Sequence, residues 1–212
     1  AITYPQPVHY RNAEGAWEEI DNTLEEDITA QGRRVLRNKS NRVKMEFPQE
    51  IDGGNMASIS CDGKTFSWRF EQEMQPARSY HYTGEELKQD RLVQKAKRMA
   101  KYVGRTEESL RSANLAVEIQ SAQEQRMEIA KIHAENCYNE VLPGVSVRYE
   151  LNGNALKEDI ILADHTALSR TAIRLPDMFD YEISALQELH VLDKNNGELL
   201  FTMNTPLVYD TD

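Results

Sequence analysis

The fold is decided by two stretches that lie more than a hundred residues apart, YPQPVHYRNAEGAWEEIDNTL (residues 4–24) and VLPGVSVRYELNGNALKEDIIL (residues 141–162). In the first, apolar and aromatic residues flank Asn12-Ala13-Glu14-Gly15, which suits a four-residue hairpin loop. In the second, apolar residues alternate with polar ones from Val145 to Leu151, ahead of the turn Asn152-Gly153-Asn154. Both stretches therefore predict β-hairpins.

More strands are predicted on either side of these two stretches. Asp62-Gly63 separates two strand-like runs, residues 58–61 and 64–70, and this dipeptide is a strong signal for a type I′ hairpin. Phe66, Trp68 and Phe70 share one face of the second run and predict an aromatic stripe in the core. Towards the C-terminus, strands are expected at residues 172–175, 181–186, 189–192 and 198–203.

The middle of the chain has a different character. Residues 83–136 contain no proline and are rich in Ala, Glu, Gln, Lys and Arg, which are good helix formers. Thr83 and Glu86 have the spacing of a capping box, and Gly104 would end a first helix before a second begins near Thr106. This pattern predicts a helical hairpin.

The expected fold class is therefore α+β overall: a mainly antiparallel, sandwich-like β-domain with an inserted α-helical hairpin. Residues 1–75 and 139–212 would form one discontinuous β-domain, and residues 76–138 would form the insertion. Neither β-part alone looks able to cover both faces of a sheet, which favours one domain over three.

Charge and composition exclude several partners. The net charge is −10 and the pI is about 5.1, whereas nucleic-acid binding needs a concentrated basic face. No apolar run approaches the roughly 20 residues that cross a bilayer, so no membrane insertion is expected. Cys61 and Cys137 lack metal-binding spacing and are interpreted as two separate, half-buried thiols, with a disulfide between them left open.

No catalytic or metal-binding motif is present. The five histidines have neither HxH nor HExxH spacing, and the chain lacks the GxSxG, GxGxxG and GxxxxGK[ST] patterns. Acidic residues cluster at 18–21, at 25–27 and at Glu158-Asp159, and we interpret each cluster as a solvated face or loop. We therefore expect no enzyme, no metal and no cofactor, and keep a glycan-cleaving enzyme that uses the acidic clusters as a third alternative.

Three aromatic residues are candidates for ligand binding. Tyr80 and Tyr82 flank His81 at the predicted start of the helices and could line a sugar-binding surface. The alternative is a packed collar where the helices meet the sheet. Trp17 has the same two interpretations, a ligand platform or packing within its hairpin.

The chain resembles the N-terminal region of secreted Gram-positive wall-associated proteins that carry DNRLRE domains or Rhs/YD repeats. The resemblance covers the two β-parts, about two thirds of the chain, and the long middle segment departs from it. It rests on these blocks, in this order: residues 4–10 with 15–24; Asn38-Lys39-Ser40-Asn41 leading to Val43 and Phe47; residues 141–145, Arg148-Tyr149 and 156–162; residues 201–206 with Tyr209-Asp210.

The resemblance implies secretion and attachment to the cell wall through other parts of a long chain. It supplies no catalytic residues for this region. We therefore predict a non-enzymatic structural, scaffolding or adhesive module of a large surface protein, whose partners would be the downstream domains of the same chain and a cell-wall glycan or a surface protein. The alternative is a carbohydrate- or cell-wall-binding module.

Overall fold

The computed structural model describes residues 7–83, 131–164 and 172–208, which form sixteen strands in four sheets and no helical element. The first nine strands are β1 His9–Arg11, β2 Trp17–Glu19, β3 Asp21–Ile28, β4 Arg34–Ser40, β5 Lys44–Pro48, β6 Glu50–Ile51, β7 Ala57–Cys61, β8 Lys64–Phe70 and β9 Ala77–Thr83. The others are β10 His133–Leu142, β11 Val145–Asn152, β12 Ala155–Leu162, β13 Ile173–Arg174, β14 Phe179–Ile183, β15 Leu189–Asp193 and β16 Leu199–Met203.

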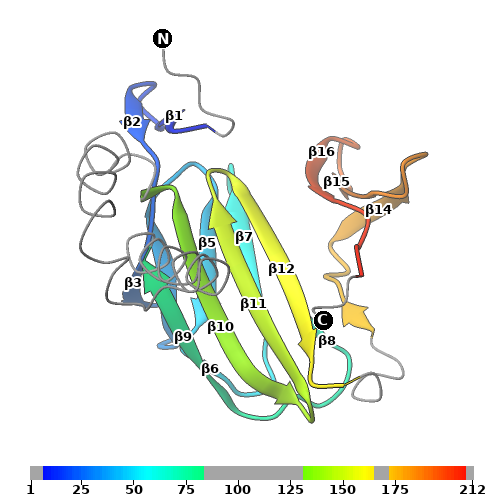
Figure 1. Cartoon of the computed structure of the whole chain (residues 1–212). Coiled ribbons are helices and arrows are strands. Elements are labelled where there is room, and N and C mark those ends of the chain that lie inside the picture. Colours follow the sequence, from blue (N-terminus) through cyan, green and yellow to red (C-terminus); the bar gives the residue numbers. More distant parts are fainter. Residues whose placement is uncertain (1–6, 84–130, 165–171, 209–212) are drawn as a thin grey trace, which may run out of the picture.

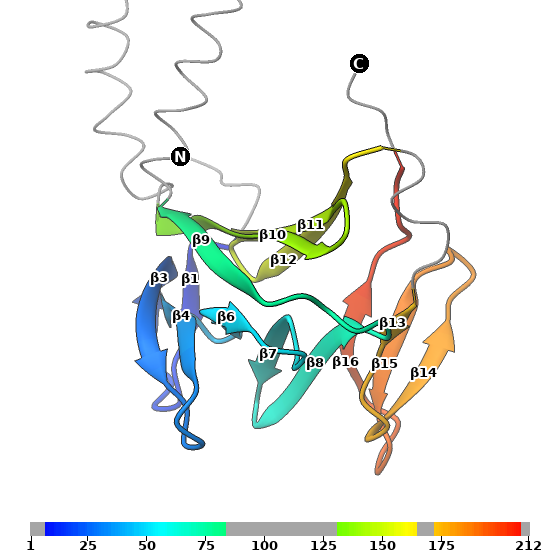
Figure 2. The ribbon, with the colours of Figure 1, turned by 90° about the horizontal axis from the view of Figure 1, so that it is seen from below.

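Two large sheets form the layers of a sandwich (Figures 1 and 2). One sheet has the strand order β12-β11-β10-β9-β6, and the other has the order β13-β8-β7-β5-β4-β3. A two-stranded sheet, β1-β2, lies at one end, and a three-stranded sheet, β14-β15-β16, lies beside β8. Every strand pair is antiparallel, so the prediction of a mainly antiparallel, sandwich-like β-fold is confirmed.

The prediction of an inserted helical hairpin is wrong: the described residues form strands and no helical element. Its expected range, 76–138, includes the strands β9 and β10, which pair with each other from Ala134–Thr83 to Tyr138–Ser79. The flanks are strands because they pair along this register. On β10 the fully buried residues Ala134, Asn136 and Tyr138 are spaced two apart, as residues on one face of a strand are. The rest of that range, residues 84–130, lies outside the described residues.

The local hairpin predictions are confirmed. Asn12-Ala13-Glu14-Gly15 connects β1 to β2, and Asn152 pairs with Ala155 across the β11–β12 turn. Asp62 and Gly63, which connect β7 to β8, have φ angles of 49° and 78°. Both angles lie in the left-handed region that a type I′ turn needs at its two central residues.

The core lies between the two large sheets. Phe66, Trp68 and Phe70 on β8 are at most 5% exposed, which confirms the predicted aromatic stripe. Tyr149 is fully buried on β11, and its ring centroid lies 5.2 Å from that of Phe47 and 6.1 Å from that of Trp68, both in the opposite layer. The Tyr138 ring, in its own layer, lies 6.3 Å away. Burial of such rings is the main source of the stability of a sandwich.

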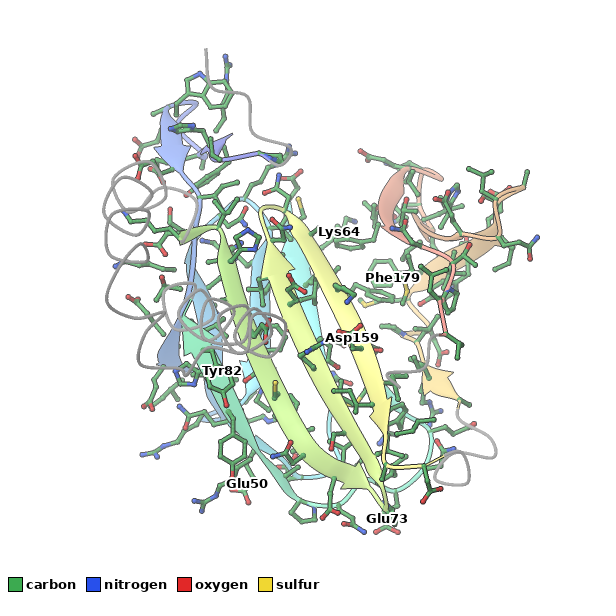
Figure 3. All side chains as sticks on the ribbon, viewed as in Figure 1. Glu50, Lys64, Glu73, Tyr82, Asp159 and Phe179 are labelled. Atoms are coloured by element: carbon green, nitrogen blue, oxygen red, sulfur yellow. The ribbon has the colours of Figure 1, made fainter. Side chains whose placement is uncertain are left out.

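The three-stranded sheet extends this core at its open side. Phe179 and Phe201, on its inner face, pack against Phe66 with centroid distances of 5.9 and 5.8 Å. Lys64 on β8 binds the Asp193 carboxylate at 2.6 Å. Figure 3 shows Lys64 and Phe179 between β12 and the three-stranded sheet.

Candidate functional site

The strongest sequence-predicted candidates lie on one exposed face of β9. Tyr80 and Tyr82 are 53% and 46% exposed. The alternative of a packed collar concerns contacts with residues 84–130, which lie outside the described residues. Side chains two residues apart on a strand point to the same side, roughly 7 Å apart. Tyr82 is labelled in Figure 3 on the outer face of the five-stranded sheet. This spacing suits two aromatic platforms for one extended ligand.

Trp17 belongs to a different part of the molecule. It is 65% exposed on β2, in the two-stranded sheet, so the structure does not place it on the sheet that carries the tyrosines. The Arg11 guanidinium lies 5.0 Å from its ring centroid, a cation–π contact within the hairpin. The hairpin is further held by Glu18, which accepts hydrogen bonds from Tyr10 Oη at 2.5 Å and Asn12 Nδ2 at 2.7 Å.

Charged residues continue the face beside the tyrosines. The register places Tyr80 opposite Cys137, then Arg148, then Asp159, in one row across four strands. Asp159 binds Arg148 Nη2 at 2.6 Å and Lys157 Nζ at 2.9 Å. Burial alone would raise the pKa of Asp159, but these two cations outweigh burial and lower it. The row therefore presents a fixed, largely neutralised set of charges.

A second polar row runs across the inner face of the same sheet. Asn136, Tyr149 and Glu158 are consecutive cross-strand partners from β10 to β12. Trp68 Nε1, from the opposite layer, donates a hydrogen bond of 2.6 Å to Glu158 Oε2. Burial raises the pKa of Glu158, and burial together with the nearby Glu158 carboxylate raises the pKa of Tyr149.

The two rows together correct the prediction for Glu158-Asp159, because each row contains one of these carboxylates. The Asp159 side chain is only 11% exposed and Glu158 is half-buried, so this acidic pair is not a solvated face. Asn136 and Tyr149 are fully buried, and within the described residues their side-chain polar atoms make no hydrogen bond. Polar groups without partners are costly in a protein interior.

Three buried asparagines, which lie in the blocks that carry the resemblance but to which no local sequence pattern gives a role, form a hydrogen-bond network. Asn22 Nδ2 donates to the backbone oxygens of Ile132 and Gly153, both at 2.8 Å. Asn22 Oδ1 accepts from Asn38 Nδ2 at 3.1 Å and from Asn41 Nδ2 at 2.9 Å. All three asparagines are at most 2% exposed. The network joins the N-terminal β-part to the chain around β10 and β11.

The other donors and acceptors of this network are also used. Asn38 binds the oxygen of Val43 and the backbone N–H of Met45. Asn41 binds the oxygen of Gly153 and the backbone N–H of Val43. Each asparagine side chain thus uses both N–H groups and its oxygen, the condition under which a buried polar network stabilises one arrangement of the chain. We call Asn22, Asn38 and Asn41 the asparagine clamp.

The two cysteines are free and half-buried, as the favoured interpretation predicted. Burial raises the pKa of each thiol, which makes both poor nucleophiles. Across the described ranges, no group of three or more His, Cys, Asp or Glu side chains could hold a metal ion. No helix in those same ranges has the length and apolar character that crossing a bilayer requires.

Comparisons with known proteins found no match to the chain among family models, curated proteins or solved structures. The resemblance to wall-associated proteins therefore stays a prediction.

Proposed function

We propose that the chain is a non-enzymatic structural or adhesive module of a large secreted bacterial surface protein, located outside the cell or on its wall. Its partners would be downstream domains of the same chain and a wall glycan or a surface protein. The asparagine clamp is the observation that carries this proposal. It joins β-parts that lie more than a hundred residues apart, with Asn22 bonded to residues 110 and 131 positions away.

A clamp of this kind suits a module that must keep its shape while it holds other domains. Each asparagine belongs to a block that carries the resemblance, Asn22 to residues 15–24 and the other two to Asn38-Lys39-Ser40-Asn41. A buried network with every donor and acceptor used favours one rigid arrangement over alternatives. Cooperative unfolding of both β-parts tests the proposal, and two separate transitions would count against it.

A second candidate, a carbohydrate- or cell-wall-binding module, is favoured by the exposure of Tyr80 and Tyr82. Aromatic side chains combine a large apolar face with a polar tip, and this is why they occur at binding surfaces. The candidate is tested by co-sedimentation with purified Gram-positive cell walls, comparing the intact chain with the Tyr80→Ala/Tyr82→Ala double variant. Tyr181→Ala is a matched control, because Tyr181 is 37% exposed on the separate three-stranded sheet.

Loss of retention in the double variant alone, with unchanged unfolding, would assign wall binding to β9. Equal retention of all three proteins would place any wall binding elsewhere. Retention of none would reject the second candidate and leave the structural module.

A further inference from the structure

A small pocket lies on the outer face of the six-stranded sheet, in the opposite layer from Tyr80 and Tyr82. Its floor is apolar and buried, formed by Val35, Pro48 and Ala57. Val35 and Pro48 are cross-strand partners on β4 and β5. The pocket has a volume of about 230 Å³, below the roughly 300–1,000 Å³ of pockets that hold drug-sized ligands. It has room for one small ring.

The rim of this pocket is polar. It is built from hydroxyl and amide side chains with one cation and one carboxylate: Thr29, Gln31, Arg33, Glu46, Asn55 and Ser58. The first three come from the turn between β3 and β4, and the others come from the strands and the loop opposite. An apolar floor with hydroxyl and amide groups around it matches a sugar ring, which has apolar C–H faces and a circumference of hydroxyls.

The two charged groups on the rim differ in how well they are paired. Glu46 Oε2 accepts a hydrogen bond from Arg37 Nη2 at 2.5 Å, so its charge is compensated from within the sheet. Arg33 Nη2 is 3.3 Å from Asp52 Oδ1, and the Asp52 side chain is 70% exposed. Exposed pairs of this kind contribute little, about 0–1 kcal/mol. A ligand carboxylate can therefore replace Asp52 as the partner of Arg33.

The position of the Arg33 guanidinium depends on a glycine. A Cβ added at Gly54 would stand 3.0 Å from Arg33 Nη2 and 3.2 Å from Nη1, so the guanidinium packs directly over this residue. The adjoining loop is also held by Arg69 Nη1, which donates to the Gly53 oxygen at 2.9 Å. The guanidinium therefore has a defined place on the rim, and a guanidinium presents N–H groups in a fork that matches a carboxylate.

We propose that this pocket binds a single sugar ring that carries a carboxylate, a uronic acid. Its carboxylate binds Arg33, its ring lies over Val35 and Pro48, and its hydroxyls bond to the neutral polar side chains of the rim. The site is independent of the β9 tyrosines and does not rest on the proposed function.

The test is a titration of the full chain with glucuronate, followed by backbone amide shifts in NMR. We expect shifts at Thr29, Arg33 and Asn55 with a Kd on the order of 1 mM, as suits a ligand with so few atoms. Glucose, which has the same ring without the carboxylate, is expected to bind at least about tenfold more weakly. Glucose that binds as well as glucuronate would overturn the proposal, and so would the absence of shifts at roughly fifty times that concentration.

Three variants locate the binding. Arg33→Gln removes the charge and should weaken glucuronate binding about tenfold or more. Arg34→Gln is the matched control and should bind as the unmodified chain does, because alternation places Arg34 on the opposite face of β4. Gly54→Ala removes no polar group and leaves a φ angle outside the left-handed region, yet it displaces the guanidinium and should also weaken binding. Unchanged affinity in Arg33→Gln would overturn the proposal.

Discussion

Replacing Asn22 by alanine is the sharpest perturbation that the structure offers. The side chain makes four hydrogen bonds, two donated to Ile132 and Gly153 and two accepted from Asn38 and Asn41. The two backbone oxygens keep one other bond each, from Gly153 N and Asn41 Nδ2. The other two asparagines each keep one N–H bonded and lose the partner of the second.

The expected loss follows from these contacts. Four hydrogen bonds at a net value of about 1 kcal/mol each give about 4 kcal/mol of unfolding free energy. The variant leaves two buried N–H groups without partners, and this sets a lower bound of about 2 kcal/mol on the loss of unfolding free energy. With a urea m-value of about 2 kcal/mol/M, the midpoint of unfolding should fall by about 1–2 M.

The assay is urea unfolding followed by tryptophan fluorescence and circular dichroism. Asn139→Ala is the matched control, because Asn139 is an exposed residue of β10, and it should change stability by no more than about 0.5 kcal/mol. Asn22→Asp keeps the volume but replaces the donating N–H₂ with a second acceptor, facing two backbone oxygens. It should destabilise at pH 7 at least as much as alanine does, and recover in part when acid protonates the carboxylate.

A loss below about 1 kcal/mol for Asn22→Ala would mean that the asparagine clamp does not stabilise the fold. An Asn22→Asp variant as stable as the unmodified protein at pH 7 would mean that the two N–H bonds donated by Asn22 contribute nothing.

Three further predictions follow from single sites. Burial raises the pKa of Glu158 above its ordinary value of 4.5. The unmodified protein should therefore gain stability relative to Glu158→Gln as the pH falls through that raised pKa, and lose it as the pH rises. A difference between their urea midpoints that stays the same from pH 4 to pH 7 would contradict this. Tyr80→Ala/Tyr82→Ala should change the melting temperature little, because both rings are exposed, and a drop of more than about 5 °C in calorimetry would instead place them in the core. Gly63→Ala should cost about 1–2 kcal/mol in urea unfolding, because φ at this position is +78°, and a neutral effect would mean that the turn relaxes freely.

The sequence was sufficient wherever structure depends on neighbours along the chain. Asp62-Gly63 predicts a hairpin because the turn conformation belongs to those two residues. The alternation from Val145 to Leu151 predicts a half-buried strand for the same local reason, and this strand has every second residue buried. The flanks of the middle segment were misassigned because helix-forming composition was extended over β9 and β10, whose strand character depends on pairing with each other.

The sites depend on contacts between distant residues, and this is why they were missed. Asn22 is buried by partners more than a hundred positions away, which no local pattern reveals. Glu158 looks like half of a solvated acidic pair until Trp68, 90 positions earlier and in the other layer, donates to it. The sequence could not decide whether Tyr80 and Tyr82 are exposed either, because an aromatic residue on a strand is equally suited to a core or a binding face.

If the asparagine clamp makes the two β-parts one structural unit, hydrogen exchange should show that both parts open together. Amide protection would be measured in β3–β4 and in β10–β11, with and without Asn22→Ala. We expect equal opening free energies for the two pairs in the unmodified protein, and an equal fall of about 4 kcal/mol in both when Asn22 is replaced. A fall confined to β3 and β4, with β10 and β11 still fully protected, would show that the β-parts open independently and would contradict this expectation.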